Sequence, residues 1–295
     1  MESLNQDGKT LNEFLAEYDA GRYHQYSVTV DMPVFTIMDE EQDNYRKLSG
    51  KSLKILLIKR KDHPFIHQWA LPGGFLRPEE SLDEAALREL REETGAEGIY
   101  MEQLYTFGEP GRDPRTRVIT CAYMALADSS GLALKADTDA MDTAWFDISY
   151  DVMKEEKERM RWGCRKTTTG RISLKHSGIS LAAVIEKITC IYPDHKKTEY
   201  VITDNDGLAF DHARIIIMAL ERLRSKVDYT DIALNLMPAL FTLTELQRVY
   251  EVILDKELLM ANFRRKTADL VEATDQFTEN AGHRPSRLYR RRVQE

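Results

Sequence analysis

The sequence of Gly74–Ala96, GFLRPEESLDEAALRELREETGA, decides the fold of this chain. It predicts a loop, one helix and a stop. Ser81 and Glu84 have the spacing of a capping box, in which each side chain accepts from the other residue's backbone amide at a helix start. Gly95 stands where helices often end in a left-handed residue. An apolar stripe at helical spacing predicts the buried face: Leu82, Ala86, Leu87 and Leu90.

Another face of this helix carries three carboxylates, Glu89, Glu92 and Glu93. Residues three and four positions apart are neighbours on a helix, so these like charges crowd together and weaken the helix in isolation. A divalent cation bound through oxygen ligands would remove the repulsion. The alternative interpretation is an ordinary solvated acidic face.

The spacing of the glycines and charged residues resembles the Nudix box, G-x5-E-x7-R-E-U-x-E-E-x-G-U, in which U is aliphatic. Leu90 fills the inner aliphatic position, and Ala96 is smaller than the usual residue at the last position. Every polar and glycine position matches: Gly74, Glu80, Arg88, Glu89, Glu92, Glu93 and Gly95. This resemblance implies an α+β fold, the Nudix α/β/α sandwich with a mixed sheet.

The same resemblance implies an activity, hydrolysis of the pyrophosphate of a nucleoside diphosphate joined to another group. Mg2+ (or Mn2+) would neutralise phosphate charge and lower the pKa of a bound water. By the family pattern Glu89 and Glu93 are the principal metal ligands and catalytic residues, with Glu92 as a supporting ligand. Arg88 would orient the glutamates through its ion pair. The general base stays open between Glu89 and a carboxylate of the acidic loop, Asp137, Asp139 or Asp142.

Two features beside the box are candidates for binding the diphosphate. Gly73 and Gly74 lack side chains, so the backbone there can approach a phosphate closely; the alternative is a plain turn. Arg112 and Arg115 lie in the turn-rich loop Gly108–Thr116, and a guanidinium can donate two hydrogen bonds to pyrophosphate at once. Surface loops also carry arginines without any ligand. Trp69 could stack on a base, although a core position is the commoner fate of a tryptophan.

Length and composition predict two domains of an ordinary globular class. The chain has 295 residues and a net charge of −8. The three cysteines are far apart and form no CxxC motif, which argues against a disulfide framework and a zinc site. The N-terminus lacks the pattern of a signal peptide, and the apolar stretches are too short to span a bilayer. We therefore expect a cytoplasmic protein with no membrane partner.

Hydrophobic periodicity predicts the remaining elements of the first domain, which we expect to span residues 1–227. The helices are a lead-in helix within 9–24, a charged surface helix over 150–161 and a long helix over Asp211–Lys226. The strands are Tyr26–Ile37, Leu53–Ile58, Ile99–Phe107, Arg117–Ala127, Thr143–Ile148, Lys166–Leu174, Leu181–Ile191 and Thr198–Thr203. The insert from about 150 to 205 is expected to extend the Nudix sheet with antiparallel strands.

Residues 228–295 are expected to form a second domain of different character. A capping box at Thr242 and Glu245 opens a helix, a second helix follows from about Met260 to Leu270, and Arg284–Arg292 is strongly basic. Between residues 262 and 294 there are eight basic and four acidic side chains, a net charge of +4 within an acidic chain. This order of helix, turn, basic helix and basic hairpin predicts a winged helix-turn-helix.

Such a domain would bind double-stranded DNA. Asparagine and arginine on the exposed face of the second helix would read bases, and basic residues of the wing would hold phosphates. The candidate residues are Asn262, Arg264, Arg265, Lys266, Arg284, Arg287 and Arg290. The alternatives are a small helical tail with a solvated basic end, or a tail that binds RNA or a protein.

Three segments of this tail resemble the winged helix of the NrtR-type Nudix-related transcriptional regulators: FTLTELQRVYEVIL (241–254), NFRRK (262–266) and HRPSRLYR (283–290). The resemblance implies ADP-ribose or a related nucleotide sugar as ligand, and a homodimer that reads a two-fold DNA site. Because every acidic position of the box is retained, the main expectation is a hydrolase that carries a DNA-binding domain. The alternative is a regulator whose Nudix domain only senses ADP-ribose or a sugar-type ligand.

Overall fold

The computed structural model describes residues 4–39, 50–95, 98–129, 140–278 and 285–293. In chain order its first part contains α1 (Leu11–Glu17), η1 (Ala20–Arg22), β1 (Ser27–Asp31), β2 (Val34–Asp39), β3 (Lys51–Arg60), β4 (Trp69–Ala70), β5 (Gly73–Phe75), α2 (Leu82–Thr94), β6 (Tyr100–Phe107), β7 (Val118–Leu126), β8 (Ala140–Met160), β9 (Gly163–His176), β10 (Ile179–Ile191), β11 (Lys196–Asp206) and α3 (His212–Val227). The second part contains η3 (Ile232–Leu236), α4 (Leu243–Leu254), α5 (Met260–Thr267), β12 (Val271–Phe277) and β13 (Arg287–Arg291).

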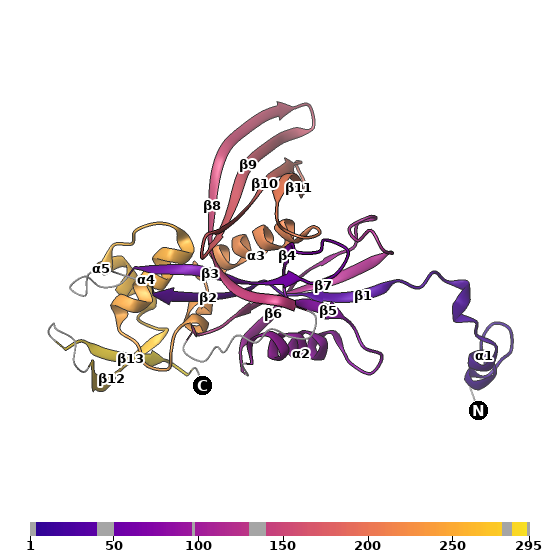
Figure 1. The fold of residues 1–295 in the computed structure, drawn as a ribbon, viewed down its shortest axis with the longest axis horizontal. Coiled ribbons are helices and arrows are strands. Elements are labelled where there is room, and N and C mark those ends of the chain that lie inside the picture. The colour runs from indigo at the N-terminus through magenta and orange to yellow at the C-terminus, as the bar shows by residue number, and fades with distance from the viewer. Residues whose placement is uncertain (1–3, 40–49, 96–97, 130–139, 279–284, 294–295) are drawn as a thin grey trace.

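One mixed sheet runs through the first part in the order β11-β10-β9-β8-β3-β2-β7-β1-β5, with β4 paired to β3 and β6 to β7. β7 is parallel to β1 and β2, and the other pairs are antiparallel. Figure 1 shows α2 on one side of this sheet and α3 on the other. The expected α+β class and the mixed-sheet sandwich are therefore confirmed.

Helix α2 forms where its local signals predict it. The Ser81 side chain accepts from the Glu84 amide, and the Glu84 carboxylate accepts from the Ser81 amide at 2.8 Å. Gly95 ends the helix with φ of 65°, in the left-handed region where glycine costs least. Ala86 and Leu90 are buried as expected, but Leu87 is 38% exposed and Ala85 is buried instead. The buried stripe is thus rotated slightly from the predicted one.

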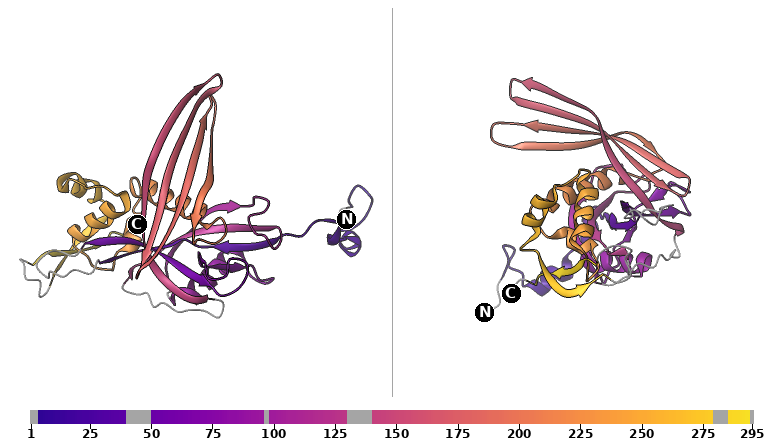
Figure 2. Two further views of the ribbon diagram at one scale, coloured as in Figure 1. Left: turned by 45° about the horizontal axis from the view of Figure 1, so that its top comes forward. Right: turned by 90° about the vertical axis from the view of Figure 1, so that its left-hand side faces the viewer.

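The expected surface helix over 150–161 is wrong, because residues 150–160 belong to strand β8 and Arg161 lies in the turn that follows. These strand residues pair with β9 from Tyr150 opposite Ile172 to Met160 opposite Gly163. Their lysines, glutamates and methionines favour helix locally, but the ladder of backbone hydrogen bonds to β9 decides the outcome. Beyond the body of the sheet, β8 to β11 continue together as a four-stranded projection (Figure 2), so the added antiparallel strands are confirmed.

Several helix and strand boundaries in the structure differ from the predicted ones. The strand expected over Tyr26–Ile37 is interrupted at Met32-Pro33 and forms β1 and β2, because proline has no amide for the ladder. The lead-in helix is confined to α1, and the second helix of the tail ends at Thr267 rather than Leu270.

The C-terminal part has the expected helix, turn, helix and β-hairpin, with Val271 opposite Arg291 in the hairpin. Its buried residues continue the main core: Leu220 and Leu223 of α3 belong to the same apolar cluster as Val249 and Ile253 of α4. The predicted boundary at 227/228 coincides with the end of α3, and the core crosses it. No helix in the described ranges is long and apolar enough to cross a membrane.

Candidate functional site

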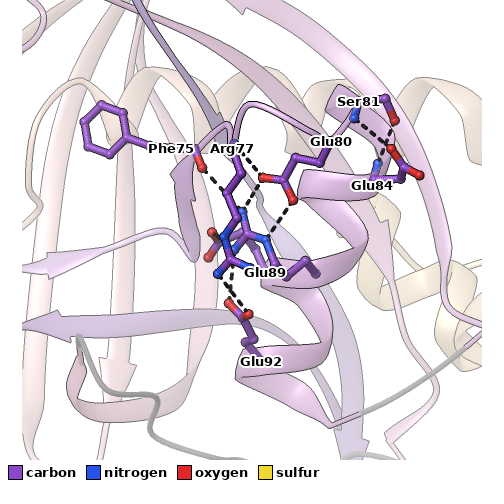
Figure 3. A network of polar contacts seen from close by, with 8 residues as sticks. Phe75, Arg77, Glu80, Ser81, Glu84, Glu89 and Glu92 are labelled. Carbon is purple, nitrogen blue, oxygen red and sulfur yellow. Dashed lines mark hydrogen bonds and ion pairs between the residues drawn. The ribbon is translucent and has the colours of Figure 1, made fainter.

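Arg88 donates to three glutamates in the polar network on α2. Figure 3 shows this network from close by, with Glu80, Glu89 and Glu92 labelled. The Nε and Nη2 of Arg88 donate to the two carboxylate oxygens of Glu80 at 2.9 and 2.7 Å. Its Nη1 donates to Glu89 at 2.6 Å and to Glu92 at 3.1 Å. One guanidinium therefore contacts three of the glutamates of the box, and the orienting role expected for Arg88 stays a prediction.

Within this network the pKa values of Glu80 and Glu89 are shifted in opposite directions. The hydrogen bonds from Arg88 lower the pKa of Glu80 to about 2, and the same contacts raise the pKa of Arg88. Burial raises the pKa of Glu89 despite its bond to Arg88. Glu89 is thus a desolvated carboxylate whose negative charge a cation would stabilise.

Close packing on β1 and α2 requires glycine at both positions of the pair. A Cβ at Gly74 would overlap Glu89 Oε1 and lie 2.8 Å from its carboxyl carbon. A Cβ at Gly73 would overlap the carbonyl oxygen of Val30 and lie 2.9 Å from Asp31 Oδ1. Both glycines belong to β5, so a plain turn does not explain them. Gly74 allows the backbone to pass directly beside the Glu89 carboxylate, and Gly73 allows it to pass beside Val30 and Asp31 of β1.

The predicted metal ligands face one pocket, but they do not form a closed cluster. Glu89, Glu92 and Glu93 all line it. Glu92 lies 3.6 Å from Arg77 as well as beside Arg88, and buried Glu93 accepts from the Thr143 hydroxyl at 3.3 Å. Within the described ranges no three His, Cys, Asp or Glu side chains converge on a common metal position. The oxygen donors nevertheless fit Mg2+, which retains several waters and shares its ligands with phosphate.

Of the three candidate carboxylates in the acidic loop, only Asp142 lies among the described residues. Asp137 and Asp139 lie outside the described residues. Asp142 is exposed, and its carboxylate accepts from the Thr143 amide at 2.9 Å. The choice of general base therefore stays open.

The pocket has a volume of about 790 Å³, within the usual range for small-molecule sites. Its walls come from β1, β3, β5, α2, the loop 108–116 and the segment that enters α3. Trp69 does not line it, because this side chain is 4% exposed and packs edge-on against Phe146 at 4.7 Å.

Both arginines predicted to bind substrate line the pocket, and both are engaged by carboxylates. Arg112 donates to the two carboxylate oxygens of Asp211 at 2.7 and 3.1 Å and lies 3.4 Å from Asp31, with a side chain only 5% exposed. Arg115 pairs with Asp113 at 2.7 Å and is half-exposed. A diphosphate would have to compete with these carboxylates for either guanidinium.

Arg60 and Phe210 were not identified from the sequence. The Arg60 Nε donates to the carbonyl of Pro64 at 2.7 Å, and its guanidinium carbon lies 4.9 Å from the centre of the Phe210 ring. Among the described residues, no acceptor binds the terminal nitrogens of Arg60. Burial and the nearby charge of Arg115 lower the pKa of Arg60. From the sequence, Arg60 belongs to a charged connection, Lys59–His67, after the predicted strand Leu53–Ile58.

His212 was also missed, and it connects α3 to the glycine strand. Its Nδ1 accepts from the Leu71 amide at 2.9 Å, and Nε2 lies 3.6 Å from Asp31 Oδ1. Complete burial lowers the pKa of His212, so the ring is neutral. No local pattern marks such a residue, because its partners are distant in sequence.

The predicted DNA-binding face is exposed on α5, where Asn262, Arg264, Arg265 and Lys266 all reach solvent. Arg265 donates to Asn262 at 2.8 Å, and Lys266 pairs with Asp228 at 3.2 Å.

In the hairpin, Arg287 lies over the Phe277 ring at 5.6 Å and Arg290 pairs with Glu272. Arg284 lies outside the described residues. The helix and hairpin thus present basic groups at one end of the molecule, where Figure 1 places α5, β12 and β13.

Comparisons with known proteins agree with this architecture. Residues 41–161 match the model of the NUDIX domain, and residues 233–291 match the NrtR DNA-binding winged helix domain. Along 99% of its length the chain is 32% identical to the "ADPR responsive transcriptional repressor NtrR" of Acinetobacter baylyi, covering 93% of that protein. Over 54% of its length it is 42% identical to the "ADP-ribose pyrophosphatase" of Methanocaldococcus jannaschii, covering 90% of that protein.

Two solved structures show the same arrangement. A MutT/nudix family protein from Enterococcus faecalis superimposes with a TM-score of 0.65 at 29% identity, covering 96% of this chain and 94% of that one. The NrtR of Shewanella oneidensis, complexed with a 27mer DNA, gives a TM-score of 0.59 at 28% identity, covering 90% and 93%. The chain therefore belongs to the family of NrtR proteins, which join a Nudix domain to a DNA-binding winged helix.

Proposed function

We propose that this protein is a transcriptional regulator that binds operator DNA through α5 and the β12–β13 hairpin, and binds ADP-ribose in the Nudix pocket. The observation that carries the proposal is the similarity to an ADPR-responsive repressor along 99% of the chain. The exposed basic face of α5 supports the DNA half of the proposal. The pocket beside the Nudix glutamates supports the ligand half.

The pocket has complementary groups for the diphosphate and the base of ADP-ribose. Arg60 has terminal donors that the described residues leave unused, and a diphosphate would accept from them. The rings of Phe75 and Phe210 offer flat surfaces, each with the Arg115 guanidinium within 6.0 Å. Glu89, Glu92 and Glu93 would hold Mg2+, which would neutralise the charge of the diphosphate.

Hydrolysis is the second candidate function, and the intact box supports it. Glu89, Glu92, Glu93 and Arg88 are all present; Arg88 holds Glu89 and Glu92, and Glu93 accepts from Thr143. The relative from Methanocaldococcus jannaschii is an ADP-ribose pyrophosphatase. Regulation was the alternative in the sequence interpretation, and the comparisons favour it over hydrolysis as the main role. We further propose that the regulator acts as a homodimer, because winged helices read two-fold sites.

One pair of assays separates these functions. Fluorescence anisotropy would measure binding to a labelled duplex from upstream of the protein's own gene, with and without ADP-ribose. Chromatography would follow AMP release from ADP-ribose with Mg2+, with Glu93→Gln as the inactive control. A ligand-dependent change in DNA affinity supports regulation. AMP release without any DNA binding would contradict it and leave the hydrolase.

A further inference from the structure

Helix α3 connects the pocket to the DNA-binding part of the chain, and we propose that it transmits ligand binding to the recognition helix α5. This inference rests on the proposed function and specifies how the two sites are coupled. The contacts at the two ends of α3 carry it, together with the buried face between them.

The N-terminal end of α3 belongs to the pocket. Phe210 and His212 line the pocket, and Asp211 between them accepts two hydrogen bonds from Arg112. The loop that carries Arg112 and Arg115 has a second link to α3, because Glu109 pairs with Arg214 at 2.6 Å. The position of this loop and the first turn of α3 are therefore coupled directly.

The strand beside Glu89 is tied to the same turn. His212 accepts from the Leu71 amide, and the chain then leads through Pro72 to Gly73 and Gly74. The backbone adds two bonds, from the Trp69 amide to the Gly207 carbonyl at 2.9 Å and from the Ala209 amide to the Trp69 carbonyl at 2.8 Å. A displacement of β5, the strand that contains Gly73 and Gly74, would therefore displace the first turn of α3.

The body of α3 is a rigid connection of 16 residues, roughly 24 Å long at the standard helical rise. One face of it is completely packed, with exposures of 0–1% for Ile215, Ile216, Ala219, Leu220 and Leu223. Close-packed interiors do not deform continuously, so a displacement of one end is carried to the other.

The C-terminal end of α3 contacts both helices of the winged-helix part, α4 and α5. The Arg224 Nε donates at 2.9 Å to the carbonyl of Ile253 in the last turn of α4. Asp228, immediately after α3, pairs with Lys266 of α5 at 3.2 Å. By contrast Arg222, two residues before Arg224, faces the Nudix sheet, where it contacts Glu102 and the carbonyl of Leu104.

Competition for arginine supplies the difference in free energy that coupling requires. A diphosphate in the pocket attracts Arg112 away from Asp211, which releases the first turn of α3. The DNA-binding arrangement keeps the Arg112–Asp211 pair. Ligand and DNA therefore favour different positions of the same helix.

The test is the coupling factor, the ratio of the Kd for operator DNA with saturating ADP-ribose to the Kd without it. Arg224→Met removes the bond to Ile253 and keeps the apolar stem, while Arg222→Met is the matched control on the Nudix side. We expect wild type and Arg222→Met to show a factor in the usual range of about 5 to 150, and Arg224→Met a factor near 1. Calorimetry should show the same ADP-ribose affinity for all three.

A second variant, Asp228→Asn, keeps the proposal testable if Arg224→Met does not fold. Asp228 is exposed, so its replacement should leave the fold intact. This variant should also lower the coupling factor. Wild-type coupling in both Arg224→Met and Asp228→Asn would overturn the role of α3 and leave the proposed function intact. A wild-type protein that binds both DNA and ADP-ribose without any coupling would overturn this inference and the regulatory function together.

Discussion

The guanidinium of Arg88 and the carboxylate of Glu80 form a two-bond pair, with Nε–Oε2 at 2.9 Å and Nη2–Oε1 at 2.7 Å. Glu80 precedes α2 and Arg88 lies in its second turn, so the pair closes the loop 75–81 onto the helix. The third nitrogen of Arg88 remains directed at Glu89 and Glu92. Glu80 thus contacts the candidate metal ligands only through Arg88, and it does not line the pocket.

Glu80→Gln should lower the melting temperature at neutral pH, because Arg88 loses one of its three carboxylate partners. The pKa of Glu80 is lowered to about 2 in the folded protein, against a usual value of about 4.3. The stabilisation is therefore fully present above the unfolded pKa and disappears as pH falls toward about 2. The difference between wild type and variant should shrink over that window in thermal melts. Glu79→Gln, the same change at the exposed neighbour, should leave the melting temperature unchanged.

Gly74→Ala should weaken ADP-ribose binding by about tenfold or more, equivalent to roughly 1.4 kcal/mol. The added Cβ would overlap Glu89 Oε1 and force that carboxylate away from the pocket. Gly108→Ala is the control, because its Cβ would only meet Ile119 at 3.8 Å. Calorimetric titration of both variants measures the effect. Equal affinities would show that the position of Glu89 does not matter for the ligand.

Arg60→Gln should reduce ADP-ribose affinity by roughly 10- to 100-fold, since charged hydrogen bonds contribute about 1.5–3 kcal/mol each. Arg60 has pocket-facing donors, whereas Lys59 on the same strand does not line the pocket. Lys59→Gln should therefore bind as wild type does. AMP, which carries a single phosphate, should be less sensitive than ADP-ribose to the Arg60 change. The opposite order would place the diphosphate elsewhere.

His212→Asn should flatten the pH dependence of stability on the acidic side of neutrality. Burial lowers the pKa of His212, so the unfolded chain binds a proton that the folded chain does not. The contribution of His212 to the free energy of unfolding is therefore fully present above its unfolded pKa of about 6.5. It declines as pH falls, by at most about 1.4 kcal/mol per pH unit. Asparagine keeps an acceptor for the Leu71 amide and does not titrate. Denaturant melts from about pH 7.5 to about pH 5.5 compare the slopes; parallel slopes would contradict the assignment.

Arg264→Ala should weaken operator binding and reduce the salt slope, log Kd against log salt, by about 1 if Arg264 contacts one phosphate. Its side chain is exposed on α5, so the fold should be retained. Arg22→Ala, at an exposed position near the N-terminus, removes the same charge and should leave the slope unchanged. Anisotropy titrations at several salt concentrations give both values. Equal slopes for all three proteins would exclude a phosphate contact.

Features with local determinants were predictable from the sequence. Helix α2 has its capping box, its closing glycine and the fixed spacing of its glutamates within a few turns of chain. The helix pair α4 and α5 was equally visible from a capping box and an apolar stripe. Capping bonds and helical neighbours depend on residues three and four apart, so a single sequence contains them.

Features that depend on distant partners were decided only by the tertiary structure. The charged segment after Tyr150 became strand because β9 lies beside it. Arg112 looked like a free loop arginine until the fold brought Asp211, 99 residues away, within 2.7 Å. Arg60, Phe210 and His212 meet in one pocket although no pattern links them. The sequence therefore determined the helix of the Nudix box and the winged helix, while long-range packing decided which side chains line the pocket and how α3 joins the two parts of the chain.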